Sequence, residues 1–267
     1  MEVKALKFGG LTAKRPIVQG GMGVGVSLSS LAGNVAKCGG IGTISGVHPG
    51  YREADFKENP FRANLRAIGN ELEKAKEIAN GGIIGFNFMT VMNHYEEYVK
   101  EAIAAGADFI VSGAGLPVNL AKYAAGTRAA ILPIVSSARA LKLIVKQWQR
   151  ADRLPDAVVV EGPLAGGHLG YPYGHLVDGT FDTLEDSLVD VVDYVRELEE
   201  KNGVIIPVIA GGGVRSHADM ERLMALGASG VQVGTKFVAT EECDAAPAFK
   251  QAYLRSRKED VQLIESP

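Results

Sequence analysis

The feature that most constrains the fold is an alternation of short β-branched runs and amphipathic helical patterns, repeated eight times along the chain. Several runs, such as the one at 158–160, are apolar at consecutive positions, which is typical of parallel strands covered on both faces. Eight strand and helix units favour a closed TIM (β/α)8 barrel in the α/β class. The expected strands span 16–20, 41–45, 83–89, 109–112, 130–135, 157–161, 207–210 and 230–233.

Helical patterns follow each of these runs. Ser216 with Asp219 resembles an N-cap with an acid three residues on, and Gly81, Gly106 and Gly227 follow expected last turns. A short insertion after the second strand (47–66) and a long loop after the sixth (170–183) are expected to border the active site. The expected helices span 29–37, 70–80, 93–105, 117–125, 137–151, 184–201, 216–226 and 245–257.

Composition is that of a single large domain that acts on a small molecule. The 267 residues, 46% of them hydrophobic, suit one barrel domain over 1–267. Lys and Arg number 28 against 31 Asp and Glu, a net charge of −3, and no basic cluster indicates nucleic acid or a membrane surface. Without an apolar signal core or an apolar run of spanning length, the chain is expected to be cytoplasmic.

Neither cysteine chemistry nor a metal site is indicated. Cys38 and Cys243 lie far apart in no ligand-like spacing, and Cys38 is expected to pack in the core. No pair of histidines shows metal-ligand spacing, so no metal is expected. His94 and His217 stand at helix starts, where surface or capping roles are typical.

A doubly wound open sheet is the competing architecture. The segment at 21–26 breaks the G-x-G-x-x-G spacing of a dinucleotide-binding turn, and no P-loop is present. A barrel instead commonly binds phosphate after its seventh and eighth strands. Glycine-rich segments stand at both places, so Gly211, Gly212, Gly213, Gly234 and Thr235 are predicted to form anion cradles.

The segment from Glu161 to Gly170 carries the best catalytic candidate. It places His168 in a glycine-rich turn directly after the sixth strand. An imidazole exchanges protons near neutral pH, and glycines let the backbone approach a ligand closely. His168 is therefore predicted to act in catalysis, whereas His175 and His48 are interpreted as pocket or plain loop residues.

Six motifs in register resemble the nitronate monooxygenase family, formerly 2-nitropropane dioxygenases, which also includes the flavin-dependent enoyl-ACP reductases. The resemblance covers nearly the whole chain. It implies FMN at the C-terminal ends of the strands, held by Gly21, Met22, Asn87, Glu161, Gly166, Gly167, Gly211, Gly212, Gly213, Gln232, Gly234 and Thr235, with His168 as the active-site histidine. The motifs are 16–22, 85–89, 112–115, 165–168, 210–214 and 231–237.

The resemblance implies a nitronate monooxygenase that converts alkyl nitronates and O2 to a carbonyl compound and nitrite. An NAD(P)H-dependent enoyl-thioester reductase on the same scaffold is the alternative. Glu161 agrees with the reductases, whereas Leu164 agrees with neither group. Relatives continue with a C-terminal segment, so a fragment is one interpretation of the chain, and a homodimer is compatible with the sequence.

Two alternatives come from other classes of protein. One is a non-catalytic flavin- or phosphate-binding barrel within a larger assembly, against which the intact glycines and His168 argue. The other is an aldolase-like barrel with a Schiff-base lysine, but the expected strands place none in the barrel interior, and Lys236 lies just beyond a cradle. The turns around Gly21 and at 113–115 also allow a purely structural interpretation.

Overall fold

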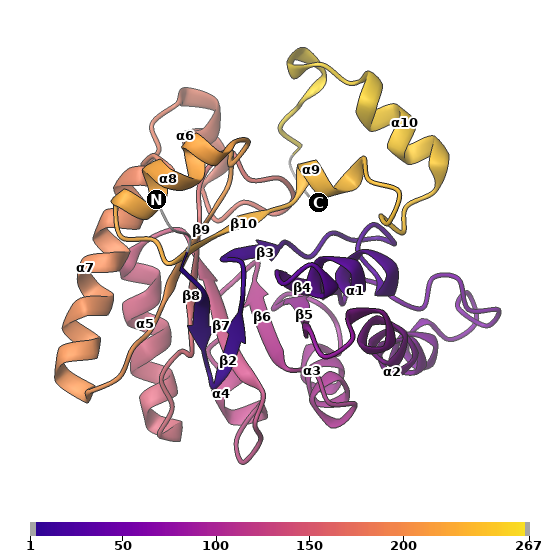
Figure 1. The fold of residues 1–267 in the computed structure, drawn as a ribbon, viewed down its shortest axis with the longest axis horizontal. Coiled ribbons are helices and arrows are strands. Elements are labelled where there is room, and N and C mark those ends of the chain that lie inside the picture. The colour runs from indigo at the N-terminus through magenta and orange to yellow at the C-terminus, as the bar shows by residue number, and fades with distance from the viewer. Residues whose placement is uncertain (1–3, 265–267) are drawn as a thin grey trace.

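The computed structural model, which describes residues 4–264, confirms the TIM barrel (Figure 1). Eight parallel strands close into a barrel in the order β10-β3-β4-β5-β6-β7-β8-β9. Four of the eight, β4, β5, β7 and β10, have the predicted bounds, and the others differ by one or two residues. The strands are β3 (Ile17–Gln19), β4 (Ile41–Ser45), β5 (Ile83–Met89), β6 (Phe109–Gly113), β7 (Ala130–Val135), β8 (Val158–Glu161), β9 (Val208–Gly211) and β10 (Gly230–Val233).

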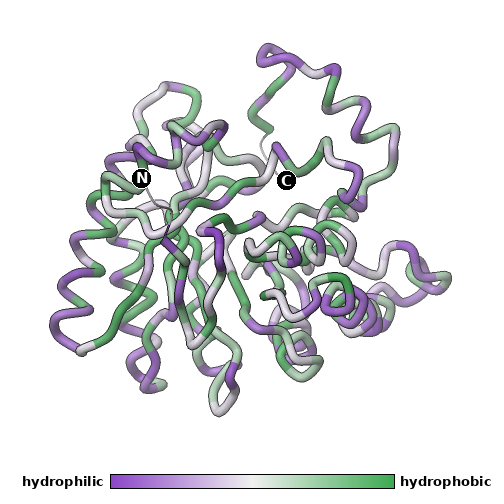
Figure 2. The backbone as a smooth tube through the Cα atoms, viewed as in Figure 1, coloured by the Kyte–Doolittle hydropathy of each residue, from purple (hydrophilic) through white to green (hydrophobic). Residues whose placement is uncertain are grey.

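Helices surround the barrel and turn their hydrophilic faces outward (Figure 2). The predicted capping box of Ser216 and Asp219 is present at the start of α8, and Gly81, Gly106 and Gly227 have positive φ after helix ends. The α-helices are α1 (Ser29–Lys37), α2 (Pro60–Ala79), α3 (Tyr95–Ala104), α4 (Leu120–Tyr123), α5 (Ala138–Trp148), α6 (Tyr173–Asp178), α7 (Leu184–Asn202), α8 (His217–Ala225), α9 (Thr235–Val238) and α10 (Pro247–Arg255). Two 3-10 turns, η1 (Gln149–Ala151) and η2 (Lys258–Asp260), complete the set.

An N-terminal hairpin, which the sequence patterns did not predict, closes the amino end of the barrel. It consists of β1 (Leu6–Phe8) and β2 (Leu11–Ala13), paired antiparallel. Leu6 and Phe8 are buried in the same cluster as Val18, Val159 and Ile209 of the barrel strands. Apolar side chains thus fill the barrel from below and leave its carboxyl-end rim as the place for polar groups.

Two sequence predictions are wrong in detail. The insertion after the second strand ends at Asn59, because Asn59 accepts a hydrogen bond from the Arg62 N–H and Pro60 is the first residue of α2. An Asn-Pro pair interpreted as a loop is therefore a helix N-cap followed by proline at N1. Cys38 is exposed rather than in the core, because α1 ends at Lys37 and Cys38 is its C-cap.

Candidate functional site

All eight barrel strands are parallel, so their carboxyl ends meet at one rim. At this rim β8, β9 and β10 hold Glu161, Gly211 and Gln232 in register, with Val18 of β3 next in line. Val159 and Ile209 belong to the interior cluster. Because side chains alternate along a strand, the residues two positions on, at 161 and 211, also face the interior. Glu161 and Gln232 therefore lie in one inward row, on either side of a residue without a side chain.

Gly211 keeps this row open. A Cβ built at Gly211 would lie 3.2 Å from the Gln232 Cβ and 3.5 Å from its Nε2. One built at Gly20 would lie 3.5 Å from the Gln232 Cγ. Within residues 4–264, neither the Gln232 amide nor the Glu161 carboxyl has a hydrogen-bond partner in the structure. Two polar side chains thus face the upper barrel with their donors and acceptors free for a ligand.

The Glu161 carboxyl is mostly buried, and burial raises its pKa from 4.5 to about 7. No cation compensates, since desolvation is the sole cause of the shift. Tyr171 donates a hydrogen bond to the Glu161 backbone carbonyl at 3.2 Å and not to its side chain. This carboxyl can therefore gain or lose a proton near neutral pH.

Asn87 approaches the backbone of Gly21 across the barrel mouth. A Cβ at Gly21 would collide with the Asn87 Cβ and lie 3.1 Å from its Oδ1. The Asn87 Nδ2 is 3.4 Å from the Val111 carbonyl, and its Oδ1 accepts no hydrogen bond within the described part of the chain. Glycine is required at position 21 because the amide group of Asn87 occupies the space that a side chain would need.

Met22 lies beside the β10 turn. A Cβ at Gly234 would be 3.4 Å from the Met22 Sδ, and the Gly20 N–H donates to the Val233 carbonyl at 2.9 Å. Thr235 follows Gly234 as the first residue of α9, and its side chain is exposed. The turn after β3 and the turn after β10 are thus packed together at the rim.

The glycine turn after β9 packs against the turn after β8. Gly212 and Gly213 have φ angles of 105° and 77°, which L side chains rarely adopt. A Cβ at Gly213 would lie 3.2 Å from Leu164 Cδ1, and one at Gly212 would lie 3.1 Å from the Ala165 nitrogen. These turns therefore present backbone rather than side chains to the rim, which is the chemistry of an anion cradle.

His168 stands apart from this cluster. It is exposed, in a loop where a Cβ added at Gly166 or Gly167 would meet no atom within 4 Å. Farther along, Ser136 Oγ donates to the Gly170 carbonyl at 3.0 Å. The structure brings together the predicted site residues from β3, β5, β8, β9 and β10, but it does not bring Gly166, Gly167 or His168 into contact with them.

Ser45 is a rim residue that the sequence patterns did not single out. It is buried, it pairs in register with Asn87, and its Oγ would lie 2.9 Å from a Cβ at Gly23. It lies on the same side of β4 as Thr43, two residues earlier. That two-residue period was the signal that could have found it.

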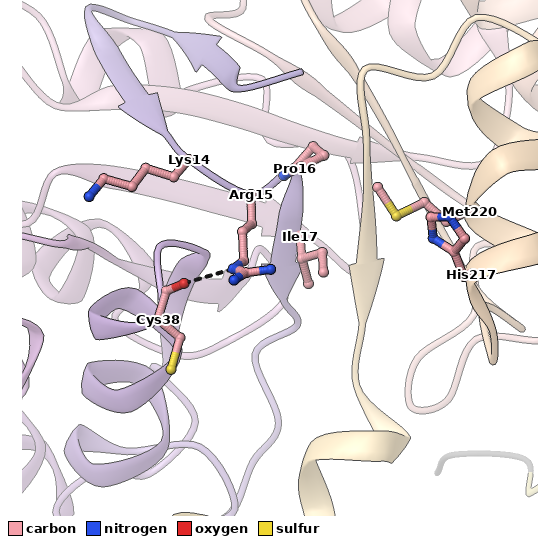
Figure 3. Close-up of a pocket in the computed structure, with 7 residues that line it drawn as sticks. All are labelled: Lys14, Arg15, Pro16, Ile17, Cys38, His217 and Met220. Carbon is pink, nitrogen blue, oxygen red and sulfur yellow. Dashed lines mark hydrogen bonds between the residues drawn. The ribbon is translucent and has the colours of Figure 1, made fainter. Parts of the chain in front are cut away.

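A cavity of about 500 Å³ lies elsewhere, on the outer face of the barrel between α1 and α8 (Figure 3). Its lining includes Arg15, Ile17, Cys38, His217 and Met220. Arg15 is turned toward α1, where its Nε donates to the Cys38 carbonyl at 3.1 Å. None of the predicted site residues lines this cavity.

Neither a metal cluster nor a membrane-spanning helix occurs in the described part of the chain. Over residues 4–264 no group of three or more His, Cys, Asp or Glu side chains could hold a metal ion. None of the helices in that range combines the length and apolar character that crossing a membrane requires.

Comparison with known proteins gives a consistent family. A probable nitronate monooxygenase of Staphylococcus saprophyticus is 25% identical over 98% of this chain and 75% of that protein. A probable nitronate monooxygenase of Bacillus subtilis is 24% identical over 93% of this chain and 73% of that protein. The solved structure of FabK from Thermotoga maritima superposes with a TM-score of 0.70 at 26% identity, over 91% of this chain and 65% of FabK.

The chain therefore spans about three quarters of these sequence relatives and just under two thirds of FabK. A nitroalkane oxidase structure from Streptomyces ansochromogenes, 22% identical with a TM-score of 0.64, shares the fold. The names of the monooxygenases and of this oxidase are those of oxidoreductases. Because the family model for nitronate monooxygenase matches residues 4–267, the chain belongs to the nitronate monooxygenase family.

Proposed function

We propose that the chain binds FMN at the carboxyl-end rim and oxidises alkyl nitronates with O2 to a carbonyl compound and nitrite. The observation that carries this is the meeting of backbone-lined glycine turns with the free polar side chains of Glu161 and Gln232. When bound, FMN supplies the electron-transfer chemistry. Two nitronates and one O2 give two carbonyl compounds and two nitrite ions, so the atoms balance.

The residues at the rim fit FMN. Gly212 and Gly213 offer backbone without side chains, and the exposed Thr235 hydroxyl next to Gly234 adds a donor. We assign the phosphate end to these turns. The net charge of −3 makes such a local backbone cradle important, because the chain as a whole does not attract anions.

The polar side chains of the mouth would hold the ring and ribityl portions. Asn87, Gln232 and Glu161 come from three different strands and have acceptors or donors that the described chain leaves free. Gly21 and Met22 form the adjoining backbone surface, against which a flat ring could pack. These side chains orient the cofactor and leave one side for substrate.

His168 is proposed to act on the substrate. Its imidazole can accept the proton of a nitroalkane or donate a hydrogen bond to the anionic nitronate. Gly166 and Gly167 have no neighbours that would obstruct a movement of their loop toward the mouth. His168 would thus approach the substrate by loop closure, since it is exposed in this structure.

Reduction of enoyl thioesters with NAD(P)H is the second candidate function. The match to FabK over 91% of this chain and the Glu161 shared with the reductases favour it. In that reaction His168 would position the thioester or the nicotinamide. The same rim residues would hold the cofactor, so the reductant decides between the two functions.

One anaerobic experiment separates them. FMN-loaded protein is mixed with propyl-2-nitronate or with NADH and NADPH, and the flavin absorbance is followed. We expect bleaching by the nitronate and, in air, nitrite formation with oxygen uptake. Bleaching by a nicotinamide alone, followed by reoxidation with crotonyl thioester, would establish the reductase instead.

A further inference from the structure

We propose that Asp244 is a positioning residue that holds the Gly20–Leu28 loop, and with it Gly21 and Met22, in the geometry that receives the flavin. Nothing in the sequence suggested a role for this residue. The inference rests on the proposed flavin site, but part of its test does not require a cofactor.

The carboxylate of Asp244 closes the start of α1. Its Oδ2 accepts hydrogen bonds from the N–H groups of Leu28 at 2.8 Å and Leu31 at 3.1 Å, and its Oδ1 accepts from Ser30 at 3.1 Å. The N-cap of α1 is Leu28, which has no side-chain oxygen, and the first turn contains no acid. A carboxylate 213 to 216 residues away therefore takes the place that a local Ser, Thr or Asp usually has.

The same segment binds the flavin-facing loop at a second point. The Asp244 N–H and the Cys243 Sγ both donate to the Val26 carbonyl, each at 3.2 Å. Val26, Val238 and Cys243 form a small buried cluster, against which Met22 packs. Loss of the Asp244 contacts would thus loosen a loop that reaches Met22.

Hydrogen bonds within the loop carry this constraint to the site. Ser27 N–H donates to the Met22 carbonyl at 2.9 Å, and Met22 N–H donates to Ser27 Oγ at 2.8 Å. The Ser27 carbonyl accepts from the Ser45 N–H at 2.9 Å at the rim. Position 22 is therefore fixed through position 27, which lies next to the Leu28 N–H that Asp244 holds.

Residues 234–244, which we call the strap, also join two parts of the proposed cofactor site. Asp244 lies ten residues after Gly234, the β10 glycine at which a Cβ would lie 3.4 Å from Met22 Sδ. The strap thus connects the phosphate cradle to the loop beside the ring. We infer that the two halves of the site keep their spacing through Asp244.

The test compares Asp244→Ala with Asp108→Ala. Asp108 is a matched control because its carboxylate also accepts a backbone N–H, from Ile84 at 2.8 Å, but at the amino end of β5. We expect Asp244→Ala to raise the Kd for FMN by on the order of 10-fold, since three hydrogen bonds to a charged group are lost. Asp108→Ala should lower the Tm and leave the Kd unchanged.

Asp244→Asn provides a graded variant if the alanine variant does not fold. Its single carbonyl oxygen can replace one carboxylate oxygen only, so it should give an intermediate Kd and partial recovery of the flavin visible circular dichroism. FMN binding and visible circular dichroism equal to wild type in the folded Asp244 variants would overturn the proposal.

Hydrogen exchange separates this inference from the proposed function. In cofactor-free protein, peptides covering 20–31 should exchange faster in the Asp244 variants and at the wild-type rate in Asp108→Ala. Unchanged exchange in 20–31 would refute the role of the strap whatever the protein binds. Faster exchange in a wild-type fold that binds no FMN would refute the proposed function and leave the role of the strap standing.

Discussion

The buried carboxyl of Glu161 makes the stability of the cofactor-free protein depend on pH. Burial raises its pKa from 4.5 to about 7, so the folded state favours the protonated form. The stabilising contribution is fully present below pH 4.5 and is lost as the pH rises through 7. The gap between the two pKa values corresponds to about 3 kcal/mol of unfolding free energy.

The perturbation is Glu161→Gln, which keeps the size and removes the charge. Between pH 5 and pH 8 the wild type should lose about 2 to 3 kcal/mol relative to this variant. For a domain of this size that is a difference in Tm on the order of 5 °C. The comparison cancels the pH dependence of all other groups.

The assay is thermal and urea unfolding of cofactor-free protein at half-unit pH steps from 4.5 to 8. Glu200→Gln, at an exposed position on α7, is the control and should parallel the wild type. Wild type and Glu161→Gln curves that run parallel over the whole range would refute the view that Glu161 is buried without a partner.

Three further predictions concern catalysis, the cofactor site and stability. His168→Ala should bind flavin normally and turn over on the order of 100-fold more slowly; wild-type turnover would remove His168 from the mechanism. Gly21→Ala, which would collide with Asn87, should weaken FMN binding on the order of 10-fold, measured by flavin fluorescence. Its control, Gly69→Ala inside α2, has open space for a methyl group and should gain about 0.5 to 1 kcal/mol; equal FMN affinities of the two variants would contradict the close approach at position 21. Asn59→Ala, which removes the α2 N-cap, should cost about 1 kcal/mol in urea unfolding, and an unchanged midpoint would contradict that cap.

The strands were the most predictable part of the fold. β4, β5, β7 and β10 have the predicted bounds, because apolar runs between glycine or polar turns leave little choice of register. The hairpin of β1 and β2 escaped because its three-residue strands show no period. The first half of α2 escaped because Asn59-Pro60 also suits a turn, and only the tertiary packing decides between a turn and a helix start.

The candidate site was predictable where it depends on the backbone. Gly21, Gly212 and Gly213 show in the structure the close contacts or positive φ angles that glycine permits. Long-range side-chain contacts were not predictable, since Asp244 meets the start of α1 across more than 200 residues. The position of His168 also could not be derived, because its loop has few neighbours to fix it.

The most direct test of the account is a titration of the purified, cofactor-stripped chain with FMN, followed by flavin fluorescence and visible absorbance. We predict saturable binding of one FMN per chain, which Gly21→Ala weakens and Gly69→Ala leaves unchanged. A chain that folds as a barrel by circular dichroism but leaves FMN fluorescence and absorbance unaltered would contradict the central claim that the carboxyl-end rim is a flavin site.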